Sequence, residues 1–309
     1  MPKATTAVLD DTERVRLDHS LAVRYLGGMA LPVPTSLESV VLTHADACAY
    51  VAPGRGGMVT RFFVGERAIL YLDEATLVDP TKNVRGGIPV LFPSPGKLAD
   101  DRFSRDGRTG KMGQHGFARN AVWEVTARAE DEVTLRLASS DETRAVYPWD
   151  FALTYRYVLG PCALRIEQRL ETTGDGPMPF GAGFHPYFQV AQSAKAITGI
   201  PTKATRAWDN AKKELLELRK PIDLTGAEVD LHLVDHDSST CALDLGDGHT
   251  VVVHAPEPFR RWIVWTLGGR DFVCVEPWTS PANALNSGQD LLTTTRGAPV
   301  TLVTEITYR

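Results

Sequence analysis

The feature that most constrains the fold is a hydrophobic pattern that repeats every two residues along much of the chain. The clearest case is FALTYRYVL, residues 151–159, in which one face would carry Phe151, Leu153, Tyr155, Tyr157 and Leu159. The same alternation occurs in TLRLA (134–138), ALRIEQRL (163–170) and TLVTEITY (301–308). A period of two is typical of β-strands that bury one face. The pattern therefore predicts an all-β chain of antiparallel strands.

Turn signals separate these strands. Asp247-Gly248 and Asp106-Gly107 are dipeptides typical of tight hairpins. The one segment with helical spacing is DNAKKELLEL, from Asp209 to Leu218, for which we expect a short helix with Asp209 as its cap. Because long helices do not alternate with the strands, we expect a large two-sheet β-sandwich rather than a parallel α/β fold. Residues 1–20 lack any such rhythm and are expected to form a flexible arm, with a single domain over 21–309.

Composition excludes several classes of protein. Of the 309 residues, 43% are hydrophobic, which is enough for a large core, and the net charge of −5 is unlike that of a nucleic-acid-binding protein. No run approaches the roughly 20 apolar residues of a membrane helix, and none near the start resembles a signal peptide. The four cysteines are far apart, as expected for reduced thiols in a core. We therefore expect a cytoplasmic protein, monomeric or homodimeric, that binds neither membrane nor nucleic acid.

Three segments break the alternation and carry ionisable groups among Gly, Pro and aromatic residues. They are residues 85–123, 180–190 and 271–288. In GFHPYF, His185 lies among aromatic residues and could transfer a proton near neutral pH, or could be a core histidine with one hydrogen bond. In FVCVEPW, Glu276 follows an apolar run predicted to be a buried strand. A carboxylate there could be a general base with a shifted pKa, or one half of a structural ion pair.

The first of these segments is also basic. Residues 97–119 contain six basic side chains and three acidic ones. The basic ones are Lys97, Arg102, Arg105, Arg108, Lys111 and Arg119, and the acidic ones are Asp100, Asp101 and Asp106. Such a patch could receive an anionic substrate, although most of these side chains are expected in a solvated loop. Arg119 follows His115 in QHGFAR, and Arg85 precedes a Gly-Gly pair. The guanidinium groups offer forks of hydrogen-bond donors.

Four motifs, in this order, resemble the aldose 1-epimerase (galactose mutarotase-like) family, close to its hexose-6-phosphate mutarotase branch. They are RGGIPVLFP, QHGFAR, GFHPYF and VEPWTSPANALNSG. The resemblance implies the galactose mutarotase-like supersandwich and the interconversion of the α and β anomers of a hexose. It also implies that His185 is the general acid, protonated in the resting enzyme, and Glu276 the general base.

Other residues take their expected roles from the same resemblance. His115 would bind the sugar and Asp230, in EVDLHL, would bind a hydroxyl group. Arg85 and Arg119 would face a phosphate if the substrate is phosphorylated. Trp278 could offer an apolar face to the sugar. Opening and reclosing the ring needs an acid and a base but no redox step, so neither an organic cofactor nor a metal is expected.

Several alternatives stay open at this point. The substrate could be the free aldose or its 6-phosphate. A non-catalytic carbohydrate-binding protein could share the fold. A glycoside hydrolase would need two carboxylates, of which Glu276 is well placed and Asp230 only loosely. A metal enzyme could use His115, His185 and Glu276, although these residues lack the close spacing of most metal motifs.

Overall fold

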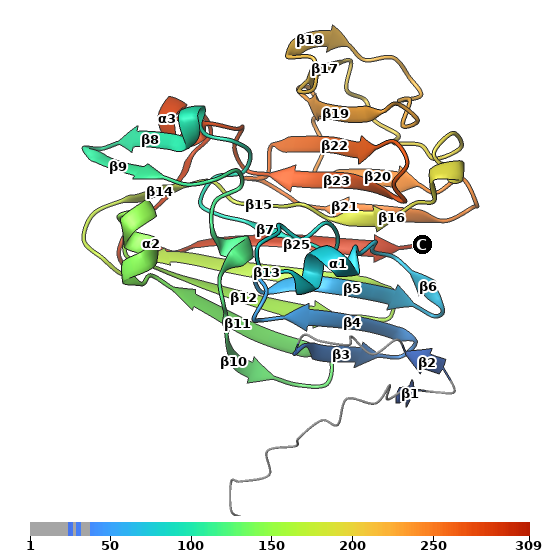
Figure 1. Cartoon of the computed structure of the whole chain (residues 1–309), viewed down its shortest axis with the longest axis horizontal. Coiled ribbons are helices and arrows are strands. Elements are labelled where there is room, and N and C mark those ends of the chain that lie inside the picture. Colours follow the sequence, from blue (N-terminus) through green and yellow to red (C-terminus); the bar gives the residue numbers. More distant parts are fainter. Residues whose placement is uncertain (1–23, 27–28, 32–37) are drawn as a thin grey trace, which may run out of the picture. The chain divides into compact units, whose positions relative to one another are not determined.

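Two large antiparallel sheets dominate the computed structural model, which describes residues 24–26, 29–31 and 38–309 (Figure 1). The first sheet has seven strands in the order β10 (Glu124–Arg128), β11 (Glu132–Ala138), β12 (Phe151–Leu159), β13 (Ala163–Thr172), β25 (Val300–Tyr308), β21 (Thr250–His254) and β20 (Thr240–Asp244). All four alternating segments of the sequence lie in this sheet. The buried residues of β12 and β13 alternate with more exposed ones, as the pattern predicts.

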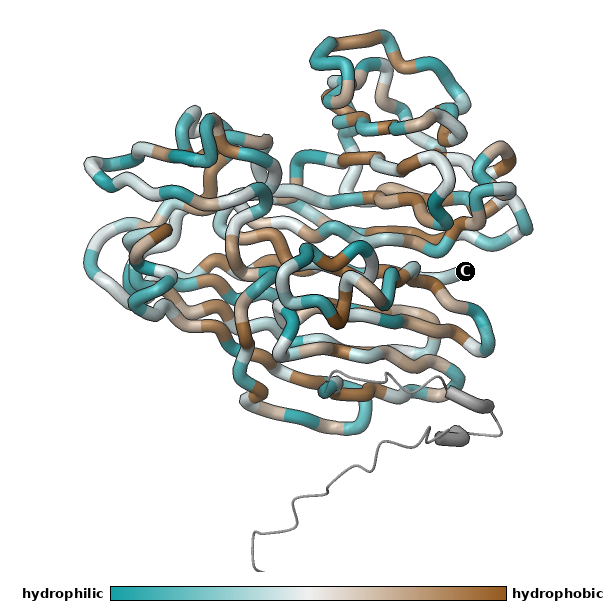
Figure 2. The backbone as a smooth tube through the Cα atoms, in the orientation of Figure 1, coloured by the Kyte–Doolittle hydropathy of each residue, from teal (hydrophilic) through white to brown (hydrophobic). Residues whose placement is uncertain are grey.

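The second sheet carries Asp230, Glu276 and Trp278, and His185 lies between two of its strands. Its order is β18 (Glu214–Glu217), β17 (Arg206–Asp209), β19 (Glu228–Leu233), β22 (Arg261–Leu267), β23 (Phe272–Trp278), β15 (Gly183–Phe184) and β7 (Val90–Leu91), with β16 (Tyr187–Gln189) also paired to β23. One core joins the two sheets: the ring of Tyr155 on β12 packs 6.1 Å from that of Phe184 on β15, between ring centroids. Figure 2 shows hydrophobic residues concentrated along the strands and hydrophilic residues in the outer loops.

Smaller elements complete the fold. A four-stranded sheet contains β3 (Val40–His44), β4 (Ala47–Ala52), β5 (Met58–Val64) and β6 (Arg67–Ala68), and two-stranded ladders pair β8 (Arg102–Arg105) with β9 (Arg108–Lys111) and β14 (Met178–Phe180) with β24 (Leu292–Thr294). The helices of the described residues are short: α1 (Glu74–Val78), α2 (Asp141–Val146), α3 (Ala284–Ser287) and the 3-10 turns η1 (Ala99–Asp101), η2 (Ala118–Asn120) and η3 (Gln192–Ala194). None of them is long and apolar enough to cross a membrane.

The chain divides into two units. Residues 38–309 belong to one compact unit, which contains both large sheets. The short strands β1 (Arg24–Leu26) and β2 (Met29–Leu31) pair antiparallel with each other and belong to the other unit. The arm expected over residues 1–20 lies outside the described residues.

Both predicted hairpins are confirmed, and the predicted helix is wrong. Asp106 and Gly107 join β8 to β9 with positive φ angles, and Asp247-Gly248 lies between β20 and β21. Residues 209–218 form the end of β17, a turn and strand β18. The side chain of Asp209 accepts hydrogen bonds from the backbone of Ala211 and Lys212, as a helix cap would, but here those bonds close a hairpin turn.

The expectation of four core thiols is also partly wrong. Cys48, Cys241 and Cys274 are buried, whereas Cys162 is exposed in the turn between β12 and β13. All four thiols are free. Burial in apolar surroundings raises the pKa of Cys241 to about 12 and that of Cys48 to about 11, so both remain protonated at neutral pH.

Candidate active site

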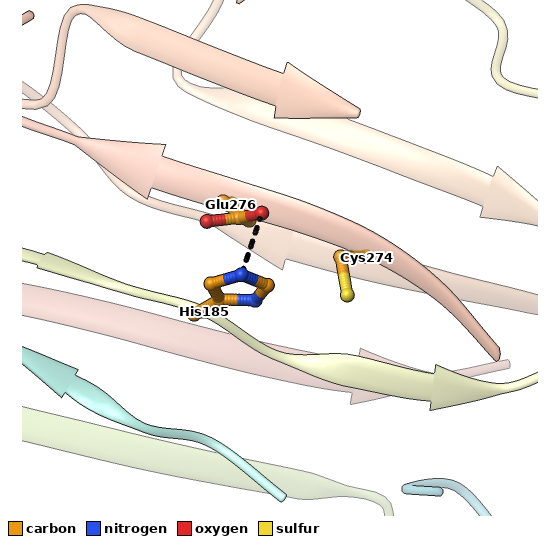
Figure 3. A group of neighbouring side chains, drawn as sticks. All are labelled: His185, Cys274 and Glu276. Carbon is orange, nitrogen blue, oxygen red and sulfur yellow. Dashed lines mark ion pairs between the residues drawn. The ribbon is translucent and has the colours of Figure 1, made fainter. Parts of the chain in front are cut away.

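Strand pairing brings His185 and Glu276 together. Glu276 lies on β23, and His185 lies in the short segment between β15 and β16, both of which pair with β23. Gly183 pairs with Trp278 and Tyr187 with Cys274, so the register on either side places His185 opposite Glu276. The His185 Nε2 atom is 3.3 Å from the Glu276 Oε1 atom. Figure 3 shows the imidazole facing the carboxyl group, with Cys274 two residues away on the same strand.

Burial opposes charge on both members of this pair. Glu276 is 1% exposed and His185 is 9% exposed. Burial, followed by the negative charge of Asp230, raises the pKa of Glu276 well above its ordinary value. Burial, followed by the positive charge of Arg119, lowers the pKa of His185 to about 3. Burial therefore favours the uncharged form of both side chains.

Aromatic rings hold the pair in place. The ring of Tyr187 stacks on the imidazole of His185 at 4.6 Å between centroids, and Trp265 meets the same imidazole edge-on at 5.4 Å. The indole N–H of Trp278 donates a hydrogen bond to Glu276 Oε2 at 3.1 Å. This bond favours the carboxylate form and so partly offsets the cost of burial. Trp278 thus contacts Glu276 directly, an interaction that the sequence does not reveal.

His115 reaches the same place from a loop. Its Nδ1 atom accepts a hydrogen bond from the backbone N–H of Gly96 at 3.0 Å. Burial and the neighbouring positive groups lower its pKa well below the ordinary value, so it is neutral with its proton on Nε2. The ring lies edge-on to His185 and to Trp278, with centroids 5.5 and 5.6 Å away. His115 is therefore a hydrogen-bond donor beside the acid–base pair.

These residues line a pocket of about 420 Å³, the size of a small-ligand site. All seven residues singled out from the sequence line it: Arg85, His115, Arg119, His185, Asp230, Glu276 and Trp278. A larger hollow of about 510 Å³ lies beside β10, β11 and α2, and it contains neither histidine nor any of these seven residues. The structure thus brings all seven predicted residues into one cavity.

The pocket is rich in cations that have no acidic partner. Arg85, Lys97 and Arg119 line it, and among the described residues none of the three forms an ion pair with a carboxylate. The guanidinium of Arg85 lies over the ring of Trp265, 5.3 Å from its centroid. Arg119 donates from Nη2 to the Gln114 carbonyl, and its Nε is buried without a partner. The rest of the predicted basic patch lies outside the pocket.

Asp230 has a different environment from Glu276. Its carboxylate accepts a hydrogen bond from the Asn210 amide at 2.7 Å, and His232 Nε2 lies 3.4 Å from it. Burial raises its pKa, but the bonds from His232 and Asn210 outweigh burial, so the pKa of Asp230 is lower than usual. The pKa shifts of Asp230 and Glu276 therefore run in opposite directions within one pocket.

Several lining residues are not found by sequence reasoning. Asn210 and Lys213 come from the hairpin that was predicted as a helix, and Tyr187, His232 and Trp265 come from strands. The available signal was alternation: Asp230 and His232 are two residues apart on β19, and both face the pocket. Lys213 is missed because the spacing of lysines and leucines in residues 209–218 also fits a helix.

The structure also groups a different set of metal-ligand types from the one considered in the sequence. His185, Cys274 and Glu276 present ligand atoms that all lie within 4.8 Å of one another. All three are buried, and burial raises the pKa of the Cys274 thiol well above its ordinary value. A metal would have to displace that proton and occupy the space between acid and base.

Known proteins share both sequence and fold with this chain. Residues 38–307 match the family described as Aldose 1-epimerase. The solved structure of the Slr1438 protein from Synechocystis sp. PCC 6803 is 34% identical, with a TM-score of 0.85, and the match covers 89% of this chain and 96% of that one. A galactose mutarotase-like protein from Lactobacillus casei ATCC 334 is 20% identical with a TM-score of 0.73, covering 88% and 100%, which supports the fold alone.

One relative of this chain has a sugar phosphate in its name. It comes from Cenchrus ciliaris, is named "Putative glucose-6-phosphate 1-epimerase", and is 28% identical over 272 residues, which cover 83% of this chain and 75% of that protein. The family match extends over nearly all of the described residues and includes every residue of the pocket. This chain belongs to the aldose 1-epimerase family, a class of isomerases.

Proposed function

We propose that this chain interconverts the α and β anomers of a hexose 6-phosphate, with the phosphate bound by Arg85 and Arg119. The observation that carries the proposal is the set of cations in the pocket, Arg85, Lys97 and Arg119, which have no acidic partner among the described residues. Arg85 and Lys97 are exposed and Arg119 is partly buried, so an anion that enters the pocket can contact guanidinium and ammonium groups that no carboxylate occupies. The name of the Cenchrus ciliaris protein supports the same substrate.

The proposed chemistry uses one acid and one base. Glu276 removes the proton of the anomeric hydroxyl while His185 gives a proton to the ring oxygen, and the bond between C1 and the ring oxygen breaks. The open aldehyde turns about its C1–C2 bond and closes from the other face. On closure His185 takes the proton of the C5 hydroxyl that attacks C1, and Glu276 returns its proton to the carbonyl oxygen, so the pair ends with the one proton it began with.

The position of that shared proton decides how the pair works. Burial displaces it toward Glu276, whereas the reaction needs it on His185. A bound sugar hydroxyl that donates to the carboxylate, together with the Trp278 indole N–H, stabilises the charged form of Glu276. The substrate therefore prepares its own base, and the pair is least reactive when the pocket is empty.

Other residues hold the sugar. His115 donates from Nε2, and Asp230, which stays charged, accepts from hydroxyl groups. Trp278 supports Glu276 rather than serving mainly as an apolar face for the sugar. A non-catalytic sugar-binding protein would not need the His185–Glu276 pair. A glycosidase needs one protonated and one ionised carboxyl group beside the scissile bond, so release of reducing sugar from aryl glycosides would distinguish that activity from anomer exchange.

The proposal is tested by anomer exchange, measured by NMR saturation transfer on glucose 6-phosphate and on glucose. Arg85→Ala and Arg119→Ala should each raise KM for the phosphate about 100-fold, because each removes a charge-assisted bond to the anion, and should change KM for glucose far less. Arg128→Ala, which truncates an exposed arginine on β10, serves as the matched control. Equal effects on both substrates would show that the arginines are structural and that the phosphate assignment is wrong.

A further inference from the structure

A third side chain lies against the acid–base pair without taking part in the proposed exchange. Cys274 is two residues before Glu276 on β23, so both side chains point to the same face of the sheet. Figure 3 shows the thiol beside the imidazole of His185 and the carboxyl group of Glu276. The three side chains present a sulfur, a nitrogen and an oxygen atom that all lie within 4.8 Å of one another. These are the ligand atoms that Zn²⁺ binds in proteins.

Cys274 lies at the floor of the pocket. Its cross-strand partners are Trp265 on β22 and Tyr187 on β16, and both of these line the pocket. Cys274 itself is completely buried and its thiol is free. His185 and Glu276 do line the pocket. An ion that binds these two residues from the pocket is therefore also within reach of the thiol.

The spacing of the three ligand atoms suits a tetrahedral ion. Bonds of about 2.0 Å to nitrogen and oxygen and about 2.3 Å to sulfur place the ligand atoms about 3.3–3.5 Å apart. The His185 Nε2 and Glu276 Oε1 atoms are 3.3 Å apart. The sulfur of Cys274 is within 4.8 Å of its two partners, and a rotation of this side chain about its Cα–Cβ bond brings it closer. Three protein ligands leave the fourth position open to water from the pocket.

The surroundings orient these atoms as the outer shell of a zinc site does. The Trp278 indole N–H holds Glu276 Oε2, which leaves Oε1 directed at His185. The stacked ring of Tyr187 fixes the plane of the imidazole. The second ring nitrogen of His185, Nδ1, is buried and has no hydrogen-bond partner in the part of the chain that the structure describes. Burial also lowers the pKa of His185 to about 3, so the imidazole is neutral, which is the form that binds a metal.

Charge in the pocket limits the strength of such a site. Arg85, Lys97 and Arg119 line the same pocket and repel a divalent cation. On binding, an S–Zn bond replaces the S–H bond of Cys274 and an O–Zn bond replaces the O–H bond of Glu276, and both protons leave to solvent. The cluster of Zn²⁺, thiolate and carboxylate then has no net charge. We therefore expect an affinity below that of a structural zinc site, which has no such cations beside it.

We propose that Zn²⁺ binds to His185, Cys274 and Glu276 and thereby inhibits the enzyme. The ion occupies the space between acid and base and binds the lone pairs that would accept protons, so the ion and the sugar exclude one another. The inference rests on the proposed function only for the inhibition, because the metal site depends on the geometry of the three side chains alone. Cys274 thus makes anomer exchange sensitive to free zinc.

The test uses Co²⁺ as a probe, because its visible spectrum reports tetrahedral coordination and its near-ultraviolet band reports a bond to thiolate. Wild-type protein should show both signals, and Zn²⁺ or glucose 6-phosphate should displace the Co²⁺. Cys274→Ser should lose the thiolate band and raise the Zn²⁺ inhibition constant for anomer exchange at least about 100-fold, since even outer-shell partners of metal ligands contribute about 10–100-fold to affinity. Cys162→Ser removes the exposed thiol and is the matched control, in which both signals should remain.

Cys274→Ala repeats the measurement with a smaller side chain, in case a buried serine hydroxyl prevents folding. Wild-type protein without a thiolate band would overturn the site, and so would a Cys274 variant as sensitive to Zn²⁺ as the wild type. Inhibition that does not weaken as the glucose 6-phosphate concentration rises would place the ion outside the pocket and overturn it too. A protein that shows the Co²⁺ spectrum but no anomer exchange would support the metal site and contradict the proposed function.

Discussion

Strands β13 and β23 lie in the interior of their sheets, yet they differ in pattern and in what they bury. β13 alternates between buried and partly exposed residues, whereas all seven residues of β23 are buried. Each strand buries a polar side chain: Gln168 on β13 donates to the Tyr155 hydroxyl at 2.6 Å, and Glu276 on β23 faces His185 across a pocket. The difference shows that a strand without alternation is covered by protein on both faces, and part of one face of β23 lines the candidate active site.

The largest expected effect comes from replacing the polar side chains at the pocket, compared with the polar side chain that β13 buries. Glu276→Gln and His185→Asn should each lower kcat for anomer exchange by about 10²–10⁴, because each removes the base or the acid. Gln168→Leu, the matched change on β13, should leave kcat within about twofold. It should alter the free energy of unfolding by about 1 kcal/mol, because it removes one buried hydrogen bond together with the unpaired oxygen of Gln168.

The measurement is saturation transfer at saturating substrate, with denaturant unfolding of each variant. The pH profile of the wild-type enzyme should be bell-shaped. Activity needs a single proton shared by His185 and Glu276, and it is lost when the pair holds no proton or two. Near wild-type exchange in either catalytic variant would refute the assigned roles. A large loss of kcat in Gln168→Leu with unchanged stability would show that β13 also contributes to catalysis, contrary to the purely structural role described for it.

An intermediate effect is expected from Arg55, which is 7% exposed and does not line the pocket. Its guanidinium donates to the backbone carbonyls of Leu77, Thr76, Asp79 and Lys82 at 2.6–3.1 Å. The hydroxyl of Thr76 in turn accepts the backbone N–H of Arg85 at 2.8 Å. Arg55 therefore positions the segment that carries Arg85 without touching the pocket itself.

Arg55→Ala should raise KM for glucose 6-phosphate about tenfold with little change in kcat, because four carbonyls lose their donor and the loop moves. Arg55→Lys should restore part of the effect. The deciding measurement is the double variant: in an Arg85→Ala background, Arg55→Ala should add almost nothing to KM. Additive effects of the two changes would mean that Arg55 acts only on stability.

The smallest expected effect concerns stability and pH. Burial raises the pKa of Glu276 above its ordinary value of 4.5, so above about pH 4.5 the folded chain holds a proton that the unfolded chain has released, and stability falls as pH rises. Glu276→Gln has no such group. Its free energy of unfolding should exceed that of the wild type near pH 8, and the difference should shrink toward pH 4.5. A difference that does not change with pH would contradict the raised pKa.

The same contrast between sheets explains what the sequence could predict. Alternation identifies strands such as Phe151–Leu159 because one of their faces is more exposed than the other. Glu276 is noticeable because a carboxylate follows an apolar run. Residues 209–218 are misread because Leu215 and Leu216 fit both a helix and an edge strand, and Asn210 and Lys213 are missed with them. Arg55 cannot be predicted at all, because its partners are backbone carbonyls that no residue pattern encodes.

The pairing of His185 with Glu276 has a consequence for how such a chain can change in length. Gly183 and Tyr187 are both bound in register to β23, which leaves three residues between them. Inserting or deleting one residue in that stretch would rotate the imidazole out of the cavity while the sheet still assembled. The number of residues from Gly183 to Tyr187 therefore has to be conserved in any variant of this chain that keeps His185 opposite Glu276.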